Sequence, residues 1–144
     1  MTEELWRLGA ADIAARTTSG EISAEEAVAS AVSRMEAVNP DLNAVVESLA
    51  GVALDRARAL DEARAAGGHV GPLFGVPVTI KVNVDQKGHA TTNGVTALKD
   101  LIAPGDAPVV KNLEAAGAVV IGRTNTPEFS FRADTDNPLY GRTR

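Results

Sequence analysis

Apolar residues recur at helical spacing in the first half of the chain, directly after a helix-start signal. Ser23 and Glu26 are three positions apart, which is typical of a capping box where each side chain satisfies a backbone N–H of the other residue. Pro40 cannot continue a helical hydrogen-bond ladder, so the pattern predicts one amphipathic helix that ends at Asn39–Pro40. Its apolar face comprises Val28, Ala31, Val32 and Met35.

Two further helices are predicted on either side of this one. The first covers residues 5–16 and is stopped by the polar stretch TTSGE. The second covers ALDRARALDEARAAGG, where Leu54, Ala57 and Leu60 share one face and the closing glycines break the helix. Between them, the short apolar stretch NAVVE is assigned to no element. Residues 1–70 are therefore interpreted as an N-terminal helical segment.

The pattern changes at Gly71, where strands replace helices. Residues 76–82 are predicted to form a strand rich in β-branched residues, and the polar loop DQKGHATTNG follows. The continuous apolar run 118–122 is typical of a strand covered on both faces. Between the strands, Asp106 is the expected N-cap of a helix whose first turn holds Pro108. The buried stripe of this helix is predicted to be Val109, Val110 and Leu113.

Strand, helix and strand in this order predict a βαβ unit. The fold class is therefore α/β, with N-terminal helices followed by the start of a mixed, largely parallel sheet flanked by helices. Residues 71–144 form the first part of that α/β core. Two strands alone make a thin sheet for this class.

One lysine interrupts the first strand, in the segment GVPVTIKVNV. The two-residue period places Lys81 on the face of Thr79 and Asn83, opposite Val78, Ile80 and Val82. Ligands bind beyond the carboxyl ends of parallel strands, and we expect a lysine there to be partly desolvated. Desolvation disfavours the charged ammonium, so such a lysine can accept a proton near neutral pH. The alternative is that Lys81 simply extends its amine to solvent, and the strand pattern leaves both open.

A second polar group is predicted at the end of the second strand. Thr126, before Pro127 and Glu128, is typical of a helix start, which places Asn125 and Thr126 at the carboxyl end of the strand, close to Lys81. Helix capping alone explains Thr126 fully and Asn125 only in part.

Composition narrows the function classes. The chain has 144 residues, is 44% hydrophobic and 23% charged, and has a net charge of -5, which argues for a globular domain and against nucleic acid as a partner. It has no run of about 18 apolar residues and no secretion signal, so neither a membrane partner nor export is expected, and a cytoplasmic location is the default. The two histidines and the absence of cysteine argue against a metal site, and no nucleotide motif or other cofactor signal occurs.

Three segments together resemble the amidase signature family: GPLFGVPVTIKVNVDQKGHATTNG, DAPVVKNLEAAGAVVIGRTNTPEF and NPLYGRTR. The resemblance implies the fold of that family, here incomplete, and a Ser–cis-Ser–Lys triad that hydrolyses a small-molecule amide to carboxylate and ammonia. The lysine of the family's GxPxxxK pattern falls on Lys81, which would accept a proton from the bridging serine. Asn83 also matches, whereas Val82 replaces the aspartate that is common after the lysine. Thr91, Thr92, Asn125 and Asn83 are interpreted as supporting or substrate-binding residues.

The family's serine-rich segment has no counterpart among the serines present. We therefore expect the chain to be an N-terminal portion that is inactive alone, truncated before the bridging and nucleophilic serines. Three interpretations stay open: a hydrolytic amidase, the amidase-like subunit of a tRNA-dependent amidotransferase, and a non-catalytic interaction module. A homodimer is also left open.

Overall fold

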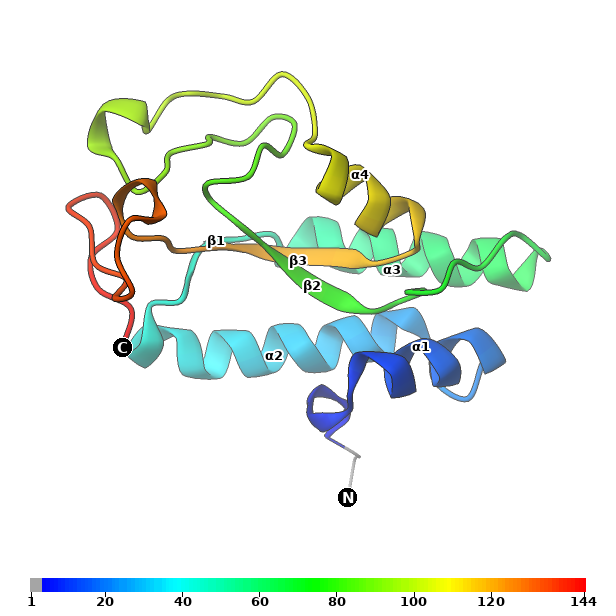
Figure 1. Cartoon of the computed structure of the whole chain (residues 1–144). Helices are drawn as coiled ribbons and strands as arrows, with labels where there is room; N and C mark the ends of the chain where they lie inside the picture. The colour runs from blue at the N-terminus through cyan, green and yellow to red at the C-terminus, as the bar shows by residue number, and fades with distance from the viewer. Residues whose placement is uncertain (1–3) are drawn as a thin grey trace. The chain divides into compact units, whose positions relative to one another are not determined.

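The computed structural model describes residues 4–144, which form four α-helices, three strands and three short 3-10 turns (Figure 1). The α-helices are α1 (Ala10–Ser19), α2 (Ala24–Leu42), α3 (Ala50–Ala65) and α4 (Pro108–Ala115). The strands are β1 (Val45–Ser48), β2 (Pro77–Lys81) and β3 (Val119–Thr124). The 3-10 turns are η1 (Leu5–Arg7), η2 (Thr96–Leu98) and η3 (Glu128–Ser130).

The strands form one mixed sheet in the order β1-β3-β2. β1 is antiparallel to β3, with Val45 opposite Thr124 and Ser48 opposite Gly122. β2 runs parallel to β3, because the bonds from Val119 N to Val76 O and from Val82 N to Thr124 O advance in the same direction along both strands. The α/β class and the mixed sheet are confirmed. β1 is the strand that the sequence pattern missed, since NAVVE is too short to show a clear period.

The chain folds into two compact units that interleave along the sequence. Unit 1 comprises residues 4–37, 49–78 and 112–121, and unit 2 comprises residues 38–48, 79–111 and 122–144. Two apolar clusters form the core of unit 1. One cluster contains Ala24, Val28, Val32, Ala53, Ala57, Leu60, Phe74, Val119 and Ile121. The other contains Leu5, Ile13, Ala14, Ile22, Ala27 and Val76.

Close backbone approach in unit 1 requires small residues. Gly75 has φ +71°, and a Cβ placed on it would lie 2.9 Å from the Cβ of Ala24. Beside it, the buried hydroxyl of Thr17 donates a 2.6 Å hydrogen bond to the carbonyl of Phe74. The segment that enters β2 is therefore fixed against both α1 and α2, which lie side by side in Figure 1.

The predicted capping box at the start of α2 is confirmed, but the predicted end of the helix is wrong. Glu26 N–H donates to Ser23 Oγ at 3.0 Å, and Ser23 N–H donates to the Glu26 carboxylate at 2.8 Å. The helix continues past Pro40 to Leu42, because proline removes one N–H and Asn43 N still bonds to Asn39 O at 2.7 Å. The end comes at Asn43, whose φ of 52° leaves the helical region.

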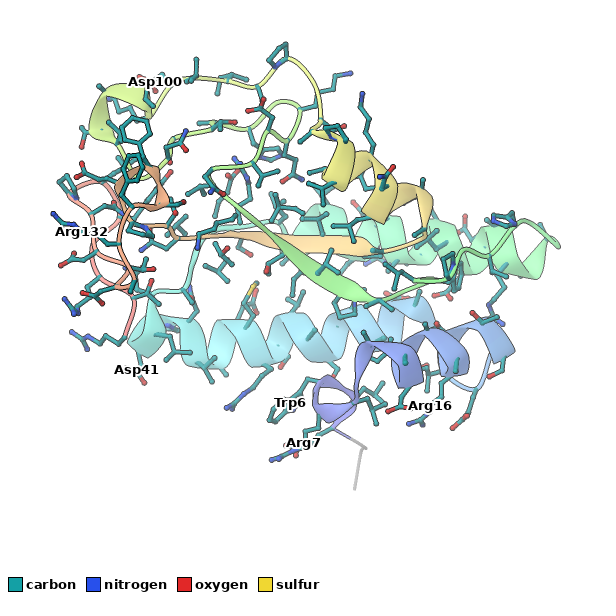
Figure 2. The ribbon with its side chains drawn as sticks, in the orientation of Figure 1. Trp6, Arg7, Arg16, Asp41, Asp100 and Arg132 are labelled. Atoms are coloured by element: carbon teal, nitrogen blue, oxygen red, sulfur yellow. The ribbon has the colours of Figure 1, made fainter. Side chains whose placement is uncertain are left out.

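The helix predicted over residues 5–16 is two elements. A 3-10 turn ends at Arg7, and α1 begins only after Gly9, whose extended backbone serves as its N-cap. Figure 2 shows Trp6 and Arg7 on this turn, where the indole ring lies 4.5 Å from the guanidinium carbons of both Arg7 and Arg34. α1 also runs beyond the predicted stop and ends at Ser19, with Gly20 at φ 78° as its C-cap.

Three predictions for the second half also need correction. Val109 is 51% exposed while Val110 is fully buried, since neighbouring residues on a helix point about 100° apart. Asp106 is not the N-cap, because α4 begins at Pro108 and Asp106 lies two residues earlier; its carboxylate accepts a hydrogen bond from Lys87 N–H at 2.7 Å. The helix predicted after Thr126 is only the turn η3, because Phe129 and Ser130 have φ values of 49° and 60°.

Candidate active site

Lys81 is the last residue of β2, where the predicted alternation of burial is confirmed. Ile80 and Val82 are 4% and 1% exposed, whereas Lys81 is exposed. Its carbonyl accepts a 2.9 Å hydrogen bond from Val84 N–H, which closes a tight turn directly after the strand. Within residues 4–144 the Lys81 side chain is exposed, so its desolvation stays a prediction for the full-length protein.

The backbone after Lys81 is held by segments from three parts of unit 2. Val82 N–H bonds to Thr124 O of β3 at 3.0 Å, and Val82 O accepts from Asn93 N–H at 3.3 Å. Asn93 O in turn accepts from Phe129 N–H at 2.9 Å. Asn93 and Phe129 both have positive φ, a conformation that costs free energy in residues with a side chain. The carboxyl ends of β2 and β3 therefore lie next to each other, as predicted, and the hydrogen bonds of these segments fix the main chain there.

Asn83 lies in the turn and contacts η3. Its Nδ2 donates to Ser130 Oγ at 2.9 Å, and Ser130 Oγ shares a 2.9 Å hydrogen bond with Thr126 Oγ1. The Oδ1 of Asn83 is buried and has no hydrogen-bond partner within residues 4–144. The side chain thus links β2 to the segment after β3 and retains one free acceptor.

The hydroxyls of Thr91 and Thr92 hold the loop that follows β2. Thr91 Oγ1 donates to the Asp85 carboxylate at 2.6 Å, and Thr92 Oγ1 accepts from Gly94 N–H at 3.3 Å. Both threonines are buried, at 7% and 1% exposure. These contacts support the loop, and neither hydroxyl contacts Lys81.

Asn125 ties the end of β3 to the C-terminal segment. Its Nδ2 donates to Gly141 O and Thr143 Oγ1 at 3.0 and 3.2 Å. Its Oδ1 accepts from Thr126 N–H at 2.9 Å and from Asn137 Nδ2 at 2.8 Å. All four hydrogen-bonding positions of the amide are occupied, so Asn125 acts in this chain as a structural link.

Arg123 is the residue that the sequence interpretation missed. It is fully buried, with Nη1 donating to Ala90 O at 2.6 Å and Nη2 donating to Val84 O at 2.9 Å. Burial lowers the pKa of the Arg123 guanidinium, while the Glu47 carboxylate, 3.8 Å from Nη1, opposes that shift. The signal was present in the sequence, since Arg123 directly follows the apolar run AVVIG.

Glu47 also contacts one of the histidines. Its Oε1 lies 2.7 Å from His89 Nδ1, so β1 is linked through Glu47 both to β3 and to the loop after β2. Among residues 4–144, no three His, Cys, Asp or Glu side chains gather in a way that could hold a metal ion. In the same part of the chain, every helix is too short or too polar to cross a bilayer.

Comparisons with known proteins identify the family. The profile of the family described as Amidase matches residues 26–144. The indoleacetamide hydrolase of Bradyrhizobium diazoefficiens is 60% identical over 139 residues, which is 96% of this chain and 26% of that protein. A glutamyl-tRNA(Gln) amidotransferase subunit from Moorella thermoacetica is 41% identical over 141 residues, covering 98% of this chain and 29% of that relative.

The fold agrees with these similarities. The X-ray structure of the peptide amidase from Stenotrophomonas maltophilia superimposes with a TM-score of 0.84 at 36% identity, over 96% of this chain and 30% of that chain. The chain thus spans between a quarter and a third of the length of these relatives. With a family profile matched over most of its length and the same fold as a solved amidase, this chain belongs to the amidase signature family.

Proposed function

We propose that the full-length protein hydrolyses a primary carboxamide to a carboxylate and ammonia, with Lys81 as the general base of a Ser–cis-Ser–Lys triad. The observation that carries the proposal is the position of Lys81. It stands at the carboxyl end of β2 with its side chain pointing away from the core, while hydrogen bonds to Val84, Thr124 and Asn93 fix the surrounding main chain. A catalytic base needs such a rigid support.

The proposed chemistry follows from the weak nucleophilicity of a hydroxyl. Lys81 takes the proton of a bridging serine, which takes the proton of the nucleophilic serine as that oxygen attacks the carbonyl carbon. The carbon–nitrogen bond then breaks, ammonia leaves with the returned proton, and water hydrolyses the acyl-enzyme. Lys81 must be neutral to begin this sequence, and we propose that further segments of the protein cover and desolvate it.

We propose that the serines of the triad lie in a part of the full-length protein that this chain does not span. Within residues 4–144, Lys81 makes no hydrogen bond or ion pair through its side chain. Ser130 is engaged with Thr126 and Asn83 instead. We accordingly expect the 144-residue chain alone to lack amidase activity.

The substrate class is proposed from the relative that is 60% identical, whose name specifies indoleacetamide hydrolysis. An arylacetamide, with an aromatic ring one carbon from the carboxamide, is therefore the first substrate to test. The second candidate function is that of a tRNA-dependent amidotransferase component, supported by relatives at 40–41% identity over nearly the same residues. That function would require partner subunits and glutamine as the ammonia donor.

The test compares Lys81→Ala with wild type in the full-length protein, measuring ammonia release from indole-3-acetamide. Loss of a general base should lower kcat/KM by about 10²- to 10⁴-fold. Lys99→Ala is the matched control, since Lys99 is an exposed lysine that pairs only weakly with Asp100, and it should leave the rate unchanged.

Near-wild-type turnover by Lys81→Ala would refute the assignment of the base. Ammonia release from glutamine that appears only with partner subunits, and no hydrolysis of arylacetamides, would favour the amidotransferase function instead.

A further inference from the structure

We infer that Arg123 is a positioning residue for Lys81: its guanidinium fixes the two ends of the loop that follows the catalytic strand. This inference rests on the function proposed above, since it explains how the base is held. It concerns a residue with no expected contact to substrate, and all of the atoms involved belong to unit 2.

The two carbonyls that Arg123 binds lie at opposite ends of one loop. Nη2 contacts Val84 O at 2.9 Å and Nη1 contacts Ala90 O at 2.6 Å, so one side chain closes the segment 84–90. A planar guanidinium presents several N–H groups in a rigid fork, which suits two separate acceptors. Arg123 thereby sets the spacing between the end of β2 and the start of the Thr91–Thr92 segment.

Val84 connects Arg123 to Lys81, because its N–H and its carbonyl each form one of the two hydrogen bonds involved. Val84 N–H donates to Lys81 O at 2.9 Å, while Val84 O accepts from Arg123. The turn that begins at Lys81 is therefore held at its far end by the guanidinium. Loss of that contact would free the turn and allow the Lys81 backbone to move.

The charge of Arg123 gains little from ion pairing. The guanidinium is completely buried, its Nε has no hydrogen-bond partner within residues 4–144, and its nearest carboxylate, Glu47, is 3.8 Å away and partly exposed. Replacing a buried ion pair by apolar groups is often neutral or stabilising, because charges are costly to desolvate. The close contacts of the guanidinium are instead its two hydrogen bonds to the ends of the loop.

The other charged groups at this site act on the same loop. Glu47 also binds His89 at 2.7 Å, and Asp85 binds Thr91 at 2.6 Å. Both His89 and Asp85 lie within residues 84–90, the segment that Arg123 closes. Removing the guanidinium would leave Val84 O and Ala90 O without this donor and Glu47 without its nearby arginine.

The experiment uses the full-length protein with Arg123→Met, Arg123→Lys and Lys81→Ala. Methionine fills much of the volume without donors, while lysine keeps the charge and part of the donor set. We expect kcat for amide hydrolysis, per correctly folded molecule, to fall in the order Arg, Lys, Met, with about a 10²-fold loss for Met and little change in KM. Amide hydrogen exchange in residues 84–90 should accelerate in the same order.

Arg58→Met is the control, because Arg58 is an exposed arginine on α3 that pairs with Glu25 and Asp55, and its kcat should equal that of wild type. Equal kcat for Arg123→Met and wild type would overturn the inference, as would a loss that raises KM alone. If Arg123→Met does not fold, the Lys variant decides: a lowered kcat with unchanged KM supports positioning, and a wild-type kcat with unchanged exchange overturns it. Full activity of Lys81→Ala would instead refute the proposed function.

Discussion

Unit 1 and unit 2 are each stabilised internally by a different kind of interaction. Unit 1 is built on two apolar clusters in which helices pack against the first part of β3 and the segment leading into β2. In unit 2 the fully buried side chains include Arg123 and Thr126, and amide side chains donate hydrogen bonds to backbone carbonyls far away in sequence. The first half of β3 thus belongs to an apolar core, and its second half belongs to a polar network.

The polar hydrogen bonds of unit 2 join residues that are far apart in the sequence. Asn43 Nδ2 donates to Tyr140 O, 97 residues away, and Thr143 Oγ1 donates back to Asn43 O. Such bonds leave no local period in the sequence, whereas an amphipathic helix does. Lys81 and Asn83, which are proposed to belong to the active site, lie in unit 2, where the precise position of a side chain matters more than the area it buries.

The largest expected effect is loss of a core side chain in unit 1. Phe74→Ala removes a ring that is 1% exposed from the larger apolar cluster, and should lower the free energy of unfolding by about 3–5 kcal/mol. Urea denaturation followed by circular dichroism measures the change. Phe131→Ala, at a ring that is 86% exposed, is the control and should change stability little. Equal losses for the two variants would contradict the account of unit 1 as the apolar core.

The polar network of unit 2 should respond less strongly to a single deletion. Asn125→Ala removes an amide with four hydrogen bonds and leaves buried partners such as Asn137 Nδ2 with one partner fewer, at a cost of about 1–3 kcal/mol. Exchange of the amides in residues 137–143 should rise, as measured by mass spectrometry. Asn112→Ala, on the exposed side of α4, serves as the control. Unchanged exchange in residues 137–143 would show that Asn125 is not their anchor.

This contrast explains which features could be predicted from the sequence. The capping box at Ser23, the alternation around Lys81 and the βαβ order all depend on neighbours a few residues apart, and the structure confirms them. β1 could not be predicted, since it is defined by its pairing with β3 across more than half of the chain.

The candidate site was only partly predictable for the same reason. Its strand position followed from the alternation, and the family pattern pointed to Lys81 and Asn83. The partners of Arg123 and Asn125 are set by tertiary contacts. Arg123 was therefore missed, and the binding of the Asn125 amide to the C-terminal segment could not be predicted from the strand pattern. The exposure of Lys81 depends on what covers the sheet end, which a strand pattern cannot show.

The smallest expected effect is electrostatic and concerns an exposed carboxyl group of unit 1, that of Glu26. Hydrogen bonds from Ser23 lower the pKa of the Glu26 carboxyl below 4.5, so the folded state favours the ionised form. The resulting stabilisation is present above about pH 4.5 and is lost as the pH falls through the lower folded pKa. Because glutamine can also close a capping box, Glu26→Gln removes the charge and keeps the hydrogen bond.

The variant should therefore be less stable than wild type by about 0.3–1 kcal/mol near neutral pH, and this difference should vanish in acid. Denaturant unfolding at several pH values measures the difference. Glu36→Gln, at an exposed site farther along the same helix, controls for the loss of one carboxylate away from the helix start. A stability gap that stays constant or widens as the pH falls would contradict a lowered pKa, because protonation of the wild-type carboxyl must abolish the advantage of its charge over a neutral amide.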